Sequence, residues 1–114
     1  MSSRKKQLDG YLDGLDQLGK EAPDIISAYT GMQCAVFSPG ALDVKTKHLI
    51  GVSISCANQC KHVIVHHISE ALKAGARRDE IIEAALVSVA LGSGSPLAYA
   101  ATVLKQALDE LGAM

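Results

Sequence analysis

Apolar residues recur every three to four positions along most of the chain, which is the spacing of one face of an α-helix. Near the start, Leu8, Leu12 and Leu15 follow this spacing, and polar residues fill most of the positions between them. No segment alternates apolar and polar residues over the length of a strand. The pattern therefore predicts an all-α protein.

Capping and helix-breaking residues divide this pattern into about six helices joined by short loops. Residues 38–40 end the second helix, Asp43 is a suitable N-cap for the third, and Gly75 follows the fourth. The predicted helices span residues 4–19, 23–37, 44–56, 59–74, 77–91 and 95–111. A chain of 114 residues has the size of one domain. We therefore expect a single-domain helical bundle.

Residues 84–104 contain no charged side chain and approach the length of a membrane span. The turn-forming run from Gly92 to Pro96 interrupts this stretch. Two buried helices joined by a tight turn explain the stretch better than a span does. We expect no contact with a membrane.

The composition narrows the functional class. A net charge of −1 and the absence of Trp argue against a nucleic-acid-binding surface. Three cysteines are an odd number and do not suggest the disulfide framework of a secreted protein. The basic segment 1–6 precedes no apolar signal region. We expect a cytoplasmic protein with reduced thiols.

Most side chains capable of chemistry lie in one short segment, residues 56–67. Cys56, Cys60, His62 and His67 fall within it, and His48 lies just upstream. Cysteine supplies a nucleophilic thiolate, and histidine transfers protons near neutral pH. These five residues are the candidate catalytic site.

A helical wheel ranks these residues. Cys60 and His67 are seven positions apart and project onto the same apolar stripe. Cys60 also lies in the first turn of its helix, where the helix dipole favours the thiolate form. We expect Cys60 and His67 to lie within hydrogen-bond or one-water reach. His66 falls on the polar arc and is expected to be a solvated surface residue, whereas Cys34 is expected to be buried core.

Two other interpretations remain open for this segment. Free cysteine is often a buried space-filling residue, so Cys60 could have no chemical role. The spacings Cys56-x3-Cys60 and His62-x3-His66 also resemble those of a zinc site. However, Cys60 and His62 project to different helix faces, and no loop separates the two pairs. We expect neither a metal nor a cofactor.

Several landmarks agree in order and spacing with one family. They are residues 22–24, 40–50, 71–76, 79–84 and 92–96. In these the chain resembles the carboxymuconolactone decarboxylase and AhpD-like family. The resemblance implies an AhpD-like helical bundle over residues 22–114, and residues 1–21 would add an amphipathic helix packed on the core or on a neighbouring subunit. It also implies a homotrimer or a hexamer.

The two branches of this family use different residues. The peroxidase-like branch carries E-x11-C-x2-C-x3-H, in which Cys60 and His67 match the first cysteine and the histidine. His48 stands at the glutamate position and Val63 at the second cysteine. The decarboxylase branch carries H-x4-H, which His62 and His67 match. The chain is therefore a hybrid of the two patterns.

Three functions follow from this hybrid. The first is a thiol oxidoreductase, a weak peroxidase or a disulfide-exchange protein with a small-molecule substrate or redox partner. In it, Cys60 would be the nucleophile, His67 would take its proton, His48 or His62 would relay it, and Cys56 would be the resolving thiol. The second is a cofactor-free lyase acting on a small lactone or carboxylic acid through His62 and His67. The third is a non-catalytic helical oligomer that has lost the dithiol.

Overall fold

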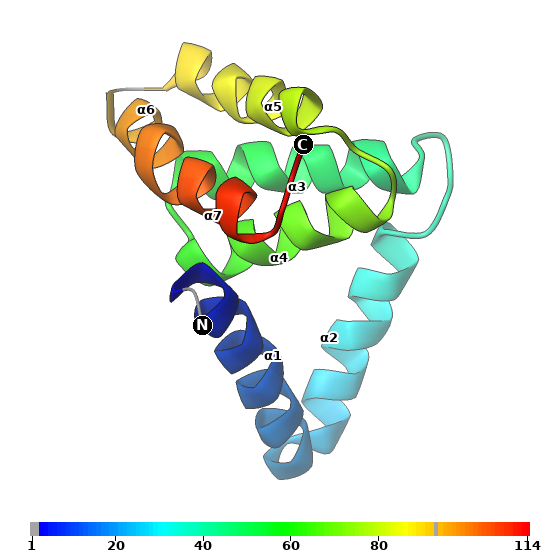
Figure 1. Ribbon diagram of the computed structural model, residues 1–114. Coiled ribbons are helices and arrows are strands. Elements are labelled where there is room, and N and C mark those ends of the chain that lie inside the picture. Colours follow the sequence, from blue (N-terminus) through cyan, green and yellow to red (C-terminus); the bar gives the residue numbers. More distant parts are fainter. Residues whose placement is uncertain (1–2, 93) are drawn as a thin grey trace.

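The computed structural model describes residues 3–92 and 94–114, and every regular element in these ranges is helical. Six helical segments follow one another as the sequence predicts (Figure 1). The first five are α1 (Ser3–Glu21), α2 (Pro23–Val36), α3 (Val44–Asn58), α4 (Lys61–Lys73) and α5 (Arg78–Leu91). The last comprises α6 (Gly94–Tyr99), the π-helical turn η1 (Ala100–Leu104) and α7 (Lys105–Glu110). The predicted all-α bundle is confirmed.

The hydrophobic core lies between α3, α4, α5 and the C-terminal segment. Its fully buried side chains include Val52, Ile64, Ile68, Ile81 and Leu108. Burying each such side chain stabilises the fold by about 1.5–3 kcal/mol. Since α3 packs against both α4 and α5 (Figure 1), the helices that carry the candidate site residues form the centre of the bundle.

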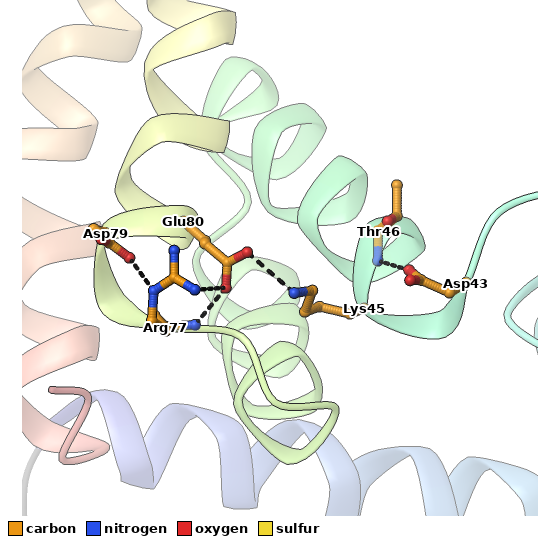
Figure 2. Close-up of polar contacts among 6 residues, drawn as sticks. All are labelled: Asp43, Lys45, Thr46, Arg77, Asp79 and Glu80. Atoms are coloured by element: carbon orange, nitrogen blue, oxygen red, sulfur yellow. Dashed lines mark hydrogen bonds and ion pairs between the residues drawn. The ribbon is translucent and has the colours of Figure 1, made fainter.

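The starts of α3 and α5 are capped and linked to each other (Figure 2). Asp43 accepts a hydrogen bond from the backbone N–H of Thr46 at 2.7 Å, which confirms it as the N-cap of α3. At the start of α5, Glu80 accepts from the backbone N–H of Arg77 at 2.9 Å. The same carboxylate pairs with Lys45 at 3.1 Å. One carboxylate therefore joins the two helix ends.

Helices α4 and α3 each end at a residue in the left-handed backbone conformation. Gly75 has φ +93° just beyond α4, as the sequence predicts, and the backbone N–H of Ala76 donates to the Ala71 carbonyl at 2.9 Å. At the end of α3 the left-handed position is held by Gln59, with φ 55°. A non-glycine residue in this conformation is uncommon. It marks the turn between the two site-bearing helices.

Helices α1 and α2 form a V that projects from the bundle (Figure 1). One arm, α1, lies against α4, and its Leu8 is buried in the core. The other arm, α2, has no buried residue in the described chain, although it is rich in apolar side chains. Ile25 is 72% exposed and Met32 is 55% exposed. The isolated chain therefore leaves an apolar helix uncovered.

The uncharged stretch 84–104 is divided between two helices. α5 ends at Leu91 and α6 begins at Gly94, while Ser93 of the predicted turn lies outside the described residues. Within the described ranges, no helix is both long enough and apolar enough to cross a membrane.

Candidate active site

Two histidines from neighbouring helices meet at the centre of the site. Nδ1 of His48 on α3 lies 3.1 Å from Nδ1 of His67 on α4, which is a hydrogen-bond distance. When both rings are neutral, one must donate from Nδ1 and the other must accept there. The structure thus brings together two of the five residues that the sequence nominates.

Gly51 and Phe37 hold the two rings in place. A β-carbon at Gly51 on α3 would lie 2.8 Å from Cγ and Nδ1 of His67, so only glycine leaves room for the ring. Phe37, just beyond α2, stacks on His48 with ring centroids 4.5 Å apart and 17° between the planes. Its ring is also 5.3 Å from that of His67. Packing as well as hydrogen bonding therefore fixes the pair.

A cavity of about 350 Å³ opens beside the histidine pair. One wall is a face of α4, on which Val63, His66, His67 and Glu70 follow one another at helical spacing. From α1, Tyr11 meets His66 edge-on, with ring centroids 6.0 Å apart. The predicted solvated position of His66 is wrong, because α1 covers the arc of α4 on which this residue lies.

Helix α2 supplies the opposite wall of the cavity. Tyr29, Gln33 and Cys34 line it, and Phe37 completes it. Cys34 is exposed, so the prediction that it belongs to the core is wrong. The apolar pattern of α2 is real, but nothing in the described chain packs on its outer face.

Burial keeps the histidines of the cavity neutral. The pKa of His67 is lowered to about 4, mainly by burial; the neighbouring His66 and His48 contribute to the shift and Glu70 opposes it. The pKa values of His48 and His66 are also lowered, in each case mainly by burial. At neutral pH each ring therefore offers one N–H donor and one basic nitrogen. Such a set can move protons without carrying a net charge.

Cys60 lies apart from the histidine cavity. It is the N-cap of α4, and its Sγ is 3.8 Å from the Asn58 carbonyl oxygen. Cys60 does not line the cavity. Seven residues along α4 correspond to a rise of about 10 Å between Cys60 and His67. No direct hydrogen bond joins these two side chains in the described chain.

Cys56 belongs to a second cluster, at the α6 side of the bundle. Its side chain is fully buried, with Sγ 3.5 Å from the Pro96 carbonyl oxygen. Nearby on α6, the Tyr99 hydroxyl is buried and has no hydrogen-bond partner among the described residues. Burial raises the pKa of Tyr99 to about 12; Arg4 opposes this shift, and Cys60 and Cys56 add to it. Two thiols and one unpartnered hydroxyl therefore lie near one another, outside the histidine cavity.

His62 and Val63 occupy different surroundings. His62 is exposed, with its ring 6.5 Å from that of Tyr11, and it does not line the cavity. Val63 does line it, one turn before His67. Since Val63 stands where the peroxidase-like pattern has its second cysteine, the α4 wall of the cavity carries no thiol. The described residues also contain no group of three or more His, Cys, Asp or Glu able to hold a metal ion.

Several site residues escaped the sequence reasoning, among them Glu70, Gly51 and Tyr11. The sequence could have indicated Glu70, since it continues the helical spacing of Val63 and His67. It could also have indicated Gly51, because glycine within a helix costs up to about 1 kcal/mol relative to alanine and so suggests a close approach. No sequence pattern indicates Tyr11, because its contact with His66 depends on how α1 packs against α4.

The chain is similar in sequence to one known protein family and to individual proteins. Residues 23–106 match the carboxymuconolactone decarboxylase family, so α1 lies outside the matched region. An uncharacterised protein of the cox locus of Paracoccus denitrificans is 33% identical over 97 residues, which cover 85% of this chain and 86% of that protein. An uncharacterised protein of Cupriavidus necator is 30% identical over 87 residues, or 76% of this chain and 77% of that protein.

Solved structures of the family are similar to this chain. A carboxymuconolactone decarboxylase family protein from Legionella pneumophila aligns with a TM-score of 0.85 at 30% identity, covering 96% of this chain and 94% of that one. A family member from Thermotoga maritima aligns with a TM-score of 0.70 at 25% identity, covering 87% and 90%. The helical fold implied by the sequence resemblance is confirmed.

Proposed function

Because this chain belongs to the carboxymuconolactone decarboxylase family, we propose that it is a cofactor-free general acid–base catalyst acting on a small molecule in the cavity of His48, His66 and His67. The proposal takes up the lyase alternative that the sequence leaves open. It replaces His62, which lies outside the cavity, with His48 and His66.

One observation carries the proposal: three neutral imidazoles line the same cavity, and two of them share a hydrogen bond. Because the Nδ1 atoms of His48 and His67 face each other, Nε2 is the nitrogen left to meet a ligand. If Nε2 of His67 takes a proton from the ligand, Nδ1–H of the resulting cation can donate to Nδ1 of His48. The His67 imidazolium can then return this proton at another atom of the ligand, while the neutral His66 ring donates a hydrogen bond to the ligand.

The thiol mechanism built on Cys60 and His67 ranks behind this proposal. It needs the imidazole to take a proton from the thiol, directly or through one water. About 10 Å of helical rise lies between the two residues. The residue one turn before His67 is Val63, which has no proton to give.

Deuterium exchange into small carbon acids tests the proposal. A panel of unsaturated lactones and conjugated ketones would be incubated with the protein in deuterated buffer at pD 7.5 and followed by proton NMR. We expect the wild-type protein to accelerate exchange and His67→Gln to reduce the rate by about 100-fold or more, the scale of general acid–base catalysis. His62→Gln is the matched control on the same helix and should retain the wild-type rate.

Two outcomes would overturn the proposal. One is an equal loss of exchange in His62→Gln and His67→Gln, since His62 lies outside the cavity. The other is the absence of protein-dependent exchange across the panel, which would favour the non-catalytic oligomer.

A second candidate function is thiol oxidation at Cys56 and Cys60. The buried, unpartnered Tyr99 hydroxyl near both thiols favours it, since such a group could donate a hydrogen bond to an anionic sulfur. Cys60 thiolate would attack a peroxide oxygen and release the alcohol. The Cys60 sulfenic acid would then condense with the Cys56 thiol, forming a disulfide and water. A dithiol would have to supply two electrons to restore both thiols.

Mass spectrometry after mild peroxide treatment tests the thiol candidate. We expect a Cys56–Cys60 disulfide in wild-type protein and in Cys34→Ser. Tyr99→Phe should slow its formation while leaving deuterium exchange unchanged. Recovery of both thiols as separate sulfinic acids, without a disulfide, would exclude this route.

Self-association is also part of the proposal, as a homotrimer or a hexamer. Apolar side chains of α2, including Ile25 and Met32, are exposed in the single chain. A helix of 14 residues is marginal without tertiary packing. A second copy covering α2 would also steady the wall that carries Tyr29 and Gln33.

A further inference from the structure

The walls of the histidine cavity carry no positively charged side chain. Among the described residues that line it, Glu70 is the only one charged at neutral pH. The histidines are neutral there because burial lowers their pKa values. Burial likewise raises the pKa of Tyr11, so its phenol stays protonated. The formal charge on the cavity walls is therefore that of Glu70, whose carboxylate pairs with Lys73 outside the cavity.

The cations near the cavity are occupied elsewhere. Lys73 pairs with Glu70 at 3.4 Å from an exposed position and does not line the cavity. Lys47 donates to the carbonyl oxygens of Val36 and Ser38 at 2.7 and 2.6 Å. A carboxylate bound in the cavity would thus lose water without gaining a cationic partner, which is strongly unfavourable.

The remaining walls suit a flat and largely apolar molecule. Tyr11 from α1, Tyr29 from α2 and Phe37 at the end of α2 supply aromatic rings to the lining, together with the apolar Val63 of α4. The tyrosine hydroxyls and the amide of Gln33 can bond to a carbonyl or hydroxyl oxygen. A volume of about 350 Å³ lies at the lower end of ligand-pocket sizes, which limits the ligand to one or two rings.

From the cavity's charge and shape we propose that it binds a neutral, planar, conjugated small molecule and rejects carboxylates, and that Glu70 enforces this choice. The inference rests on the proposed use of this cavity as the active site. It narrows the substrate class to uncharged carbonyl compounds or phenols. Glu70 acts here as a specificity-determining residue rather than as a base.

Binding of benzamide and benzoate tests the inference, because these probes share shape and differ in charge. Calorimetry at pH 7.5 would give the affinities, and imidazole resonances of His66 and His67 would locate the bound probe. We expect wild-type protein to bind benzamide at least about tenfold more tightly than benzoate, a difference of about 1.4 kcal/mol. Glu70→Gln should narrow this ratio by improving benzoate binding. Glu83→Gln, the same charge change at an exposed position on α5, should leave it unchanged.

Each outcome bears on a distinct claim. Equal or tighter binding of benzoate by wild-type protein overturns the charge selection, and His67-dependent deuterium exchange would then still support the proposed function. An equal effect of the Glu70 and Glu83 variants overturns the role of Glu70. If neither probe perturbs the imidazole resonances, the cavity is not a binding site for this ligand class and the inference fails.

Discussion

At the residue scale, the central fact is an imidazole held neutral by its surroundings. His67 is packed between Gly51, Phe37 and His48, and burial penalises its charged form. A neutral pair of imidazoles joined through Nδ1 keeps one Nε2–H donor and one basic Nε2 available to a ligand. The acid–base chemistry proposed here depends on that neutrality.

The first prediction concerns the pH dependence of stability. The unfolded chain binds a proton at His67 near pH 6.5, whereas the folded chain does so only near pH 4. The unfolding free energy should therefore fall as the pH drops from 6.5 to about 4, with the contribution of His67 fully present above that window. Its upper limit is about 3 kcal/mol.

Urea titrations between pH 4 and 8 check this expectation. His67→Gln cannot take up the proton, so its unfolding free energy should fall less steeply than that of the wild type over the same window. Parallel curves for the two proteins would contradict the assigned burial of His67.

The second prediction concerns Gly51. In Gly51→Ala the new methyl group would lie 2.8 Å from the His67 ring and must displace it. We expect changed imidazole resonances for His67 and a loss of deuterium exchange, with the helical circular dichroism retained. Gly14→Ala is the control, because nothing lies within 4 Å of a β-carbon there. It should stabilise α1 by up to about 1 kcal/mol and leave exchange unchanged.

At the element scale, the site depends on how α3 and α4 begin and end. The α3–α4 turn places Cys60 at the start of α4 and keeps it away from the histidines farther along that helix. Capping at Asp43 and the Lys45–Glu80 pair set the start of α3 at Val44, four residues before His48. Helix termini thus determine which of the candidate residues can meet.

The third prediction tests the cap of α3. Asp43→Ala removes the side-chain oxygen that accepts from the Thr46 N–H, so a backbone donor loses its partner. Thermal unfolding at pH 7 should shift to lower temperature. Asp43→Asn, which can cap equally well, should stay close to the wild type. If both variants melt alike, the charge of Asp43 matters rather than its capping hydrogen bond.

At the scale of the whole molecule, α2 is an apolar arm that lines the cavity and also exposes apolar side chains. It lines the histidine cavity through Tyr29, Gln33 and Cys34. Ile25 and Met32, about one helical turn on either side of Tyr29, are exposed. Under the proposed self-association, a second copy covering these side chains would stabilise the cavity wall as well as the assembly.

The fourth prediction tests this arrangement by sedimentation equilibrium at micromolar concentration. Wild-type protein should sediment as a trimer or a hexamer. Met32→Asp places a charge on the covered face and should shift the population to monomers. Gln17→Asp makes the same charge change at an exposed position on α1 and should not. A monomeric wild-type protein would leave α2 without its proposed partner.

Local sequence signals were enough for the helices and their ends. Asp43 caps α3 and Gly75 ends α4 as predicted, because both signals act within a few residues of the backbone they satisfy. The helical wheel places Cys60 and His67 on one stripe, but it does not give their separation along the helix axis. A wheel projects residues along the helix axis, so it removes the rise that separates positions on one face.

The sequence by itself determined the helical class, the capping residues and the family, since these follow from spacing and residue type. Only the tertiary structure decided which of the candidate residues lie close together. Packing of α3 on α4 joins His48 to His67, and packing of α1 on α4 brings Tyr11 to His66. Such contacts join residues far apart in the chain, and the free energy that selects them comes from burying whole helix faces, which no local pattern encodes.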